Sequence, residues 1–235
     1  MSLPAAVDIL SIPVKLRDGS PFLSSMMLPV ILLWLSVAFL SSEGKALPDQ
    51  CVRAPGTSYM SVQEIQIGDS DPFKVVCGYD LDPGPAEISV YSNLFITNEF
   101  NRTYEEHVAG FGEVGWSNAK FFIGLQQLHL LTNSAPHEVI IDSLSMKERC
   151  DHFVVGNRTE GYMVKSTGNC FGDPCLALKK GVRFSTFDRD EDGLPDHNLA
   201  QEMGFGWWHN SRRPDPFMRY KHLAIWIRRK ETEAE

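Results

Sequence analysis

The sequence predicts an α+β domain built on a twisted, mostly antiparallel sheet with a few short helices. Short apolar segments that alternate like strands recur along the chain, separated by polar turns. Only two segments have helical spacing, and runs of strands around two short helices are typical of this class. The 235 residues are 43% hydrophobic and 22% charged, a composition that can bury a real core.

The expected elements follow from these patterns. We expect a first helix at residues 103–109, because Thr103 is a suitable N-cap residue. A second helix is expected at 125–131, where leucines gather on one face. The expected strands are 87–97, 139–141, 153–155, 162–164, 182–187 and 223–227.

The N-terminal part of the chain has the features of a signal peptide. An apolar run covers residues 26–40, interrupted only by one proline and one serine. About 15 apolar residues are too few for a comfortable membrane span, but they suit the apolar region of a signal peptide. We expect residues 1–44 to be a leader and signal peptide removed near Gly44, and residues 45–235 to form one domain. The alternative is a signal anchor that is not cleaved.

Charge and glycosylation sequons favour an extracellular protein. A net charge of −8 argues against a nucleic-acid partner, because phosphate binding needs a basic face. Two N-x-T sequons begin at Asn101 and Asn157, and we expect a glycan on at least one of them. Together with the signal peptide, they predict a secreted glycoprotein with no membrane span after cleavage.

The five cysteines fit an oxidising compartment and leave one over. Cys170 and Cys175 are close enough to pair locally, because glycine, aspartate and proline between them make a turn easy. Cys150 would then stay a buried thiol or form an intermolecular link. A metal or redox role has little support, since no C-x-x-C pair occurs.

The acidic turn at residues 184–193, F-S-T-F-D-R-D-E-D-G, is the most informative segment. Asp188, Asp190 and Asp192 alternate in a tight turn that ends in glycine. Like charges at this spacing repel one another, whereas a divalent cation coordinated by their oxygens converts the repulsion into binding. An EF-hand is excluded, because Leu199 stands where that loop needs its bidentate glutamate. A solvated acidic turn without an ion remains the alternative.

The remaining polar residues form no catalytic motif. The seven histidines are scattered, and the sequence has no H-E-x-x-H, no G-x-S-x-G and no Gly-rich phosphate loop, so we do not expect an enzyme. In the glycine-rich turn G-F-G-W-W at 204–208, Trp207 is expected to pack in the core. Trp208 and His209 are the candidates for ligand contact, because a tryptophan can stack on a sugar. A structural role is the more common one for such side chains.

Four segments, in order, resemble the fibrinogen C-terminal domain family. The acidic turn followed by G-x-G-W-W is similar to that family's calcium loop, and residues 104–112 resemble its helix ending in Y-x-x-G-F-G. Residues 121–132 are similar to its W-L-G and I-H-x-L-T segment, and residues 73–77 to its F-x-V-x-C. The resemblance covers residues 51–229 and implies the family's fold.

The resemblance also implies a Ca²⁺ site in the acidic turn. The implied ligands are the side chains of Asp190 and Asp192, the backbone carbonyl of Leu194, and one carbonyl from Asp196 or His197. Waters would complete the six to eight oxygens that calcium prefers. Asp188 would instead cap the turn or accept backbone hydrogen bonds.

The chain matches the family in one disulfide and departs from it in another. By resemblance, Cys51 pairs with Cys77, whereas the second disulfide, which would bracket the tryptophan turn, is missing because its positions hold Leu199 and Arg212. Residues that would wall the ligand pocket are also absent. Two functions therefore stay open: an innate-immunity recognition module for a glycan or acetylated ligand, or a protein-interaction or structural module with a degenerate pocket. With no coiled-coil or collagen stalk before Cys51, an oligomer would form through the globular surface.

Mass spectrometry of protein secreted by a eukaryotic host tests the secretory features. We expect cleavage near Gly44, a Cys51–Cys77 disulfide, and a glycan on Asn101 or Asn157. An intact N-terminus anchored in the membrane would contradict the cleavage.

Overall fold

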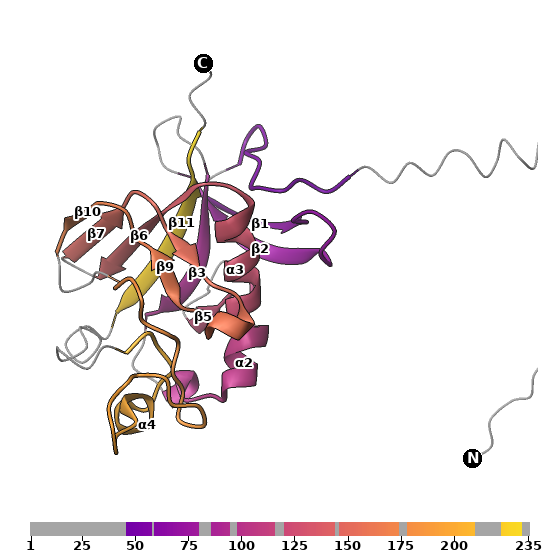
Figure 1. Cartoon of the computed structure of the whole chain (residues 1–235). Coiled ribbons are helices and arrows are strands. Elements are labelled where there is room, and N and C mark those ends of the chain that lie inside the picture. Colours follow the sequence, from indigo (N-terminus) through magenta and orange to yellow (C-terminus); the bar gives the residue numbers. More distant parts are fainter. Residues whose placement is uncertain are drawn as a thin grey trace, which may run out of the picture. The chain divides into compact units, whose positions relative to one another are not determined.

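The computed structural model describes residues 46–57, 59–79, 86–94, 98–115, 120–143, 146–173, 178–209 and 222–231 (Figure 1). From Leu47 on, these residues belong to one compact unit. The expected leader, Cys175 and Arg212 lie outside the described residues, so the cleavage and the domain start at residue 45 stay predictions. Within the described ranges, no helix is long and apolar enough to cross a membrane.

A nine-stranded antiparallel sheet organises the described chain (Figure 1). Its main path runs β1-β2-β3-β11-β6-β7-β10, while β5 pairs with β3 and with β4. A separate two-stranded sheet joins β8 and β9. The strands are β1 Met60–Ile65, β2 Phe73–Gly78, β3 Glu87–Asn93, β4 Phe111–Gly112, β5 Lys120–Phe122, β6 His137–Ser143, β7 Met146–Cys150, β8 Val154–Val155, β9 Val164–Ser166, β10 Cys170–Gly172 and β11 Leu223–Arg229.

The last strand, β11, lies in the middle of the sheet. It pairs with β3 on one side and β6 on the other, so Ile225 stands opposite both Tyr91 and Ile141. Alternate side chains, Leu223, Ile225 and Ile227, are buried in the core. This burial agrees with the strand expected at 223–227, although the structure extends it to Arg229 because the backbone ladder with β6 continues.

The helices are short and begin at clear capping signals. Thr103 caps α2: its hydroxyl accepts the N–H of Glu106, whose carboxylate accepts the N–H of Thr103. Asn157 caps η2 in the same way. Both sequon asparagines, Asn101 and Asn157, are exposed, as a glycan requires. The helices are η1 Asn98–Phe100, α2 Tyr104–Ala109, α3 Leu125–Ser134, η2 Arg158–Glu160 and α4 Leu199–Met203.

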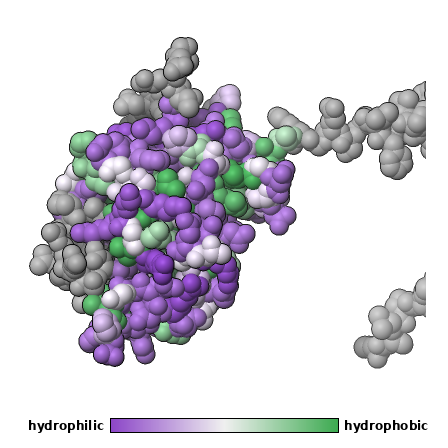
Figure 2. Space-filling view, viewed as in Figure 1, coloured by the Kyte–Doolittle hydropathy of each residue, from purple (hydrophilic) through white to green (hydrophobic). Residues whose placement is uncertain are grey.

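One hydrophobic core joins the helices to the sheet. Leu125, Leu128 and Leu131 of α3 are buried against it, as their spacing predicts. The visible face in Figure 2 is mostly hydrophilic, with scattered apolar patches. Within the described residues, the exposed large apolar side chains are Val52, Tyr59, Val62, Phe171 and Phe187.

The strands expected at 162–164 and 182–187 are wrong. Tyr162 lies in a turn with a φ of 46°, and β9 begins only at Val164. Between residues 182 and 187, Ser185 and Thr186 form isolated bridges in place of a strand. Phe184 is nevertheless buried. The alternation of apolar and polar residues along this segment therefore reflects which side chains are buried against the core. It does not mark a strand, because within the described residues the segment has no neighbouring strand to pair with.

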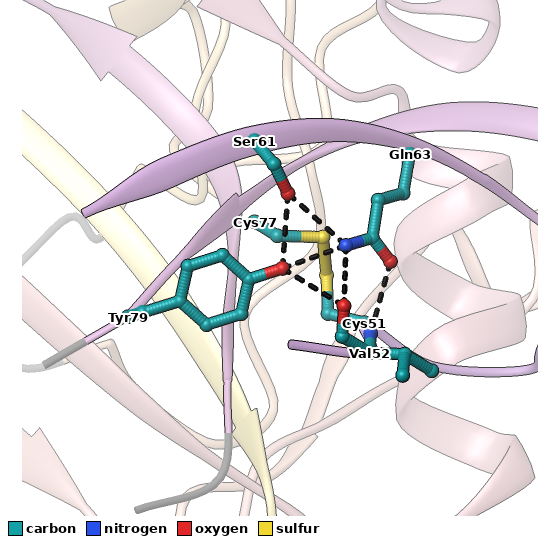
Figure 3. Close-up of a disulfide and its surroundings, with 6 residues drawn as sticks. All are labelled: Cys51, Val52, Ser61, Gln63, Cys77 and Tyr79. Carbon is teal, nitrogen blue, oxygen red and sulfur yellow. Dashed lines mark hydrogen bonds between the residues drawn. A yellow bond between two sulfur atoms is a disulfide. The ribbon is translucent and has the colours of Figure 1, made fainter. Parts of the chain in front are cut away.

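The Cys51–Cys77 disulfide is present, at a sequence separation of 26 residues. Beside it, the carboxamide of Gln63 accepts the N–H of Val52 at 2.9 Å and donates to its carbonyl at 2.7 Å (Figure 3). The hydroxyl of Tyr79 also contacts the Val52 carbonyl, at 3.2 Å. The Gln63 side chain thus pairs with Val52 as a neighbouring strand would, so the segment before β1 is held by covalent and polar contacts together.

The second disulfide joins Cys150 to Cys170, so the expected Cys170–Cys175 bond and the unpaired Cys150 are both wrong. Cys150 on β7 stands directly opposite Cys170 on β10. Strand register therefore brings these sulfur atoms together across 20 residues of sequence. Closeness in sequence favoured Cys175, but the pairing of β7 with β10 decides the partner.

Peptide mapping without reduction should recover Cys150 linked to Cys170. Because this bond closes a loop of 20 residues, Cys150→Ser should lower the free energy of unfolding by about 3 kcal/mol. Cys175→Ser is the matched control and should leave stability unchanged. A Cys170–Cys175 peptide in the map would contradict the observed pairing.

Candidate functional site

The acidic turn is anchored against the tryptophan turn by backbone hydrogen bonds. Ser185 and Trp207 exchange two of them, at 2.9 and 3.0 Å. Thr186 and Arg189 exchange another two, at 2.9 and 3.2 Å, and these close the chain on itself just before the remaining acids. These four backbone hydrogen bonds therefore fix the position of the carboxylates.

Asp188 links the acidic turn to the start of α2. Its Oδ1 accepts the backbone N–H of Tyr104 at 2.9 Å and the hydroxyl of Thr186 at 2.7 Å. Tyr104 is the first residue of α2, and an N–H at that position has no partner within its helix. A carboxylate there also interacts favourably with the helix dipole. The expectation that Asp188 accepts backbone hydrogen bonds is confirmed.

Asp192 organises the second half of the turn. Its two carboxylate oxygens accept the N–H groups of Leu194 at 2.7 Å and of Leu199 at 2.8 Å. Asp190 Oδ1 in turn accepts the N–H of Asp192 at 3.2 Å. These carboxylates therefore hold the backbone from Asp190 to the beginning of α4 without any ion.

The charges of the turn nevertheless fit a cation. Asp192 is only 8% exposed, yet no arginine or lysine of the described ranges forms an ion pair with Asp190 or Asp192. A buried charge without a counter-charge is costly. Each carboxylate oxygen that accepts one N–H keeps a second lone pair for another partner. The donor set of Asp190 and Asp192 therefore matches the oxygen chemistry of Ca²⁺.

The other residues expected at the ion are Leu194, Asp196 and His197, which follow Asp192 in the turn. The ring of His197 is exposed, and its Nδ1 lies 2.8 Å from Glu202 Oε1, a contact that raises the pKa of His197. Asp196 is exposed, with a left-handed φ of 67°. The carbonyl of Leu194 accepts no hydrogen bond within the described residues. Leu194, Asp196 and His197 therefore stay candidates through their carbonyl oxygens.

The two glycines of the G-F-G-W-W turn are required for different reasons. Gly204 ends α4 in the left-handed conformation, with a φ of 75°. Gly206 is needed for space, because a Cβ there would lie 2.7 Å from Cε1 of His107 and 2.9 Å from Cγ2 of Thr186. His107 of α2 thus packs directly beneath the tryptophan turn, a contact that sequence reasoning missed.

The tryptophan turn points its aromatic side chains inward. Trp207 is 5% exposed, which confirms its expected place in the core. Trp208 is also 5% exposed, and its Nε1 donates to the carbonyl of Tyr162 at 2.7 Å. His209 is fully buried, with Nε2 3.0 Å from the carbonyl of Phe205. The expected ligand contacts of Trp208 and His209 are therefore wrong in this structure, because both side chains are enclosed by the core.

An arginine between the acids has a role that the sequence did not reveal. The guanidinium of Arg189 lies 4.1 Å from the centre of the Tyr104 ring, a cation–π contact. It also donates twice to Glu191 Oε1, at 3.1 and 2.9 Å. Arg189 therefore ties the acidic turn to α2 a second time, beside the Asp188 contact. Only a known neighbour in space could have identified this role.

Known proteins resemble the chain over most of the described unit. The family model of the C-terminal globular domain of fibrinogen beta and gamma chains matches residues 45–223. The fibrinogen alpha chain of Rattus norvegicus is 32% identical over 160 residues, which are 61% of this chain and 20% of that protein. Ryncolin-4 of Cerberus rynchops is 32% identical over 117 residues, 47% of this chain and 33% of its own length. The chain thus spans a small part of these relatives.

Two solved structures share the fold. The fibrinogen-like globe domain of human ANGPTL2 has a TM-score of 0.65 at 22% identity and covers 78% of this chain and 100% of its own. A lamprey fibrin D-dimer, complexed with the peptide Gly-His-Arg-Pro-amide, has a TM-score of 0.63 at 16% identity and covers 88% of this chain and 86% of its own. At these identities the likeness shows the fold alone.

His107 should make stability depend on pH. Burial lowers the pKa of the folded ring to about 4 from 6.5, so protons bind the unfolded chain preferentially. The contribution of His107 to the free energy of unfolding is fully present above pH 6.5 and is lost as the pH falls towards 4. Between pH 7 and 5 this one group should cost about 2 kcal/mol of unfolding free energy.

Urea unfolding at pH 7 and pH 5 measures the effect. His107→Leu cannot titrate at this position. Between pH 7 and pH 5 its free energy of unfolding should therefore fall by about 2 kcal/mol less than that of the wild type. His152→Gln is the matched control, because that ring is exposed in the folded chain, and it should behave as wild type does. Equal losses in wild type and His107→Leu would show that the ring is not kept neutral by burial.

Proposed function

The chain belongs to the fibrinogen C-terminal domain family, and on that premise we propose that it is a secreted recognition module whose acidic turn binds calcium. The observation that carries the proposal is the buried Asp192 carboxylate, which lacks a positive partner among the described residues. It lies in the same turn through which Asp188 contacts α2. An ion there would act on the turn and on α2 together.

The residues that would hold the ion are those of the second half of the turn. Asp190 and Asp192 would provide carboxylate oxygens, Leu194 a carbonyl, and Asp196 or His197 another. A bound calcium ion supplies positive charge that offsets the repulsion between the two carboxylates. Asp188 would stay with its N–H and hydroxyl donors and would act by positioning the turn.

We propose an extracellular polypeptide as the ligand class. The lamprey fibrin that shares this fold was solved with a peptide, which supports binding of this kind by the fold. The glycan or acetylated-ligand alternative loses two expected contacts, because Trp208 and His209 are buried. No catalytic role is proposed for any residue.

Thermal unfolding in calcium and in chelator tests the metal site. Asp190→Asn keeps an oxygen for the N–H of Asp192, so in chelator it should melt like wild type, but it should lose the protection given by calcium. At ten times the dissociation constant that protection is about 1.4 kcal/mol, and extracellular modules bind at about 10⁻⁴ to 10⁻³ M. Glu202→Gln, outside the donor set, is the matched control and should keep the protection.

Asp188→Ala separates positioning from binding. It should lower stability by about 1.5–3 kcal/mol in calcium and in chelator alike, because it removes hydrogen bonds to a charged group. Wild-type protein that melts identically in both conditions would show that the turn is acidic without an ion.

Column binding tests the ligand class. The full secreted chain should pass through a resin of N-acetylated sugar in calcium. Retention there, followed by release with chelator, would establish the glycan alternative in place of a polypeptide ligand.

A further inference from the structure

A cavity of about 730 Å³ lies at the end of the sheet where β11 finishes. Four segments line it: residues 49–51, the start of β3, the chain from the end of α3 to His137, and residues 229–231. In Figure 1 the end of β11 lies near the first described residues, and the Arg229–Asp49 ion pair at 2.8 Å confirms this. We call this cavity the terminal cleft. Its volume lies in the range of small-ligand sites, about 300–1,000 Å³.

His137 presents a hydrogen-bond acceptor to the terminal cleft. The residue is 3% exposed, and its Nδ1 lies 2.8 Å from the carbonyl of Ala135. A carbonyl can only accept, so Nδ1 carries the proton and Nε2 of the neutral ring keeps its lone pair. Nε2 makes no hydrogen bond within the described residues. Burial, together with Arg229, lowers the pKa of the ring and favours the neutral form.

The charged groups around the cleft complete its chemistry. Arg229 is already paired with Asp49, whereas Lys230 is exposed and forms no direct ion pair within the described residues, although its charge helps to lower the pKa of Asp151. Asp49 Oδ1 and the exposed carboxylate of Glu231 are further acceptors. Exposed Pro136 and the small accessible part of Ile88 add apolar surface between these polar groups. The cleft thus offers several acceptors and one cation without a direct ion pair, with some apolar surface between them.

We infer that the terminal cleft is a binding site for an acidic sugar of the uronic acid type. The ligand's carboxylate pairs with Lys230, and a ring hydroxyl donates to His137 Nε2. Asp49 and Glu231 accept from further hydroxyls, while the C–H face of the ring lies on Ile88 and Pro136. One negative charge matches the one unpaired cation, and several hydroxyl donors match the several acceptors. A neutral sugar leaves Lys230 unmatched, and a simple carboxylate leaves the acceptors unmatched.

Calorimetric or NMR titration of the full secreted chain with glucuronate tests the site. Glucose and acetate are the matched probes, one without the carboxylate and the other without the hydroxyls, and both should bind at least tenfold more weakly. Lys230→Ala should weaken glucuronate binding about tenfold or more, since it removes a charge-assisted contact. Lys180→Ala, at an exposed lysine outside the cleft lining, should bind as wild type does.

The His137→Asn variant isolates the acceptor. An asparagine amide can replace Nδ1 as the donor to Ala135 but has no counterpart of Nε2, so the fold is kept while glucuronate affinity falls. Binding should be the same in calcium and in chelator, which separates this site from the acidic turn. Equal affinity for glucose and glucuronate, unchanged affinity in both cleft variants, or no binding at millimolar glucuronate would each overturn the inference.

Discussion

The sheet depends on the insertion of its last strand between two halves that are otherwise separate. Strands β1, β2 and β3 follow one another in sequence, and so do β6 and β7, and among the described strands only β11 hydrogen-bonds to both groups. Its buried Ile225 and Ile227 also join the two sides of the core. Because the strand lies near the C-terminus, the central pairing is long-range, and its loop-closure entropy must be offset by the contacts made on both sides. The terminal cleft exists because β11 brings Arg229 and Lys230 beside the segment at residues 49–51.

The acidic turn shows how carboxylates can hold a loop and still retain charge for a ligand. Asp188 and Asp192 satisfy backbone N–H groups in α2, in the turn and at the start of α4. By resemblance, Leu199 stands where the family has a cysteine, and here its N–H is held by Asp192. Hydrogen bonds between Ser185 and Trp207 fix the other side of the tryptophan turn. Non-covalent contacts thus hold both sides of this turn within the described residues.

The aromatic residues of that turn illustrate a conflict between ligand contact and stability. Trp208 and His209 are polar enough to bind a ligand, but Nε1 of Trp208 and Nε2 of His209 each have a partner in the protein interior. Gly206 lets His107 approach closely, which brings α2 against the turn. The consequence is a packed support of aromatic side chains and α2 beneath the acidic turn.

The sequence by itself determined the local features of this protein. The α+β class, the capping box at Thr103, the leucine face of α3 and the closing strand all arise from short-range periodicity and capping chemistry, which need no distant partner. The acidic pattern likewise indicated the candidate calcium turn, and the motif order indicated the family. Tertiary structure alone decided the partner of Cys170, the burial of Trp208 and His209, and the meeting of His137 with Lys230 around one cleft. Each of these depends on strand register or on packing between distant segments, and neither is encoded in the spacing of neighbouring residues.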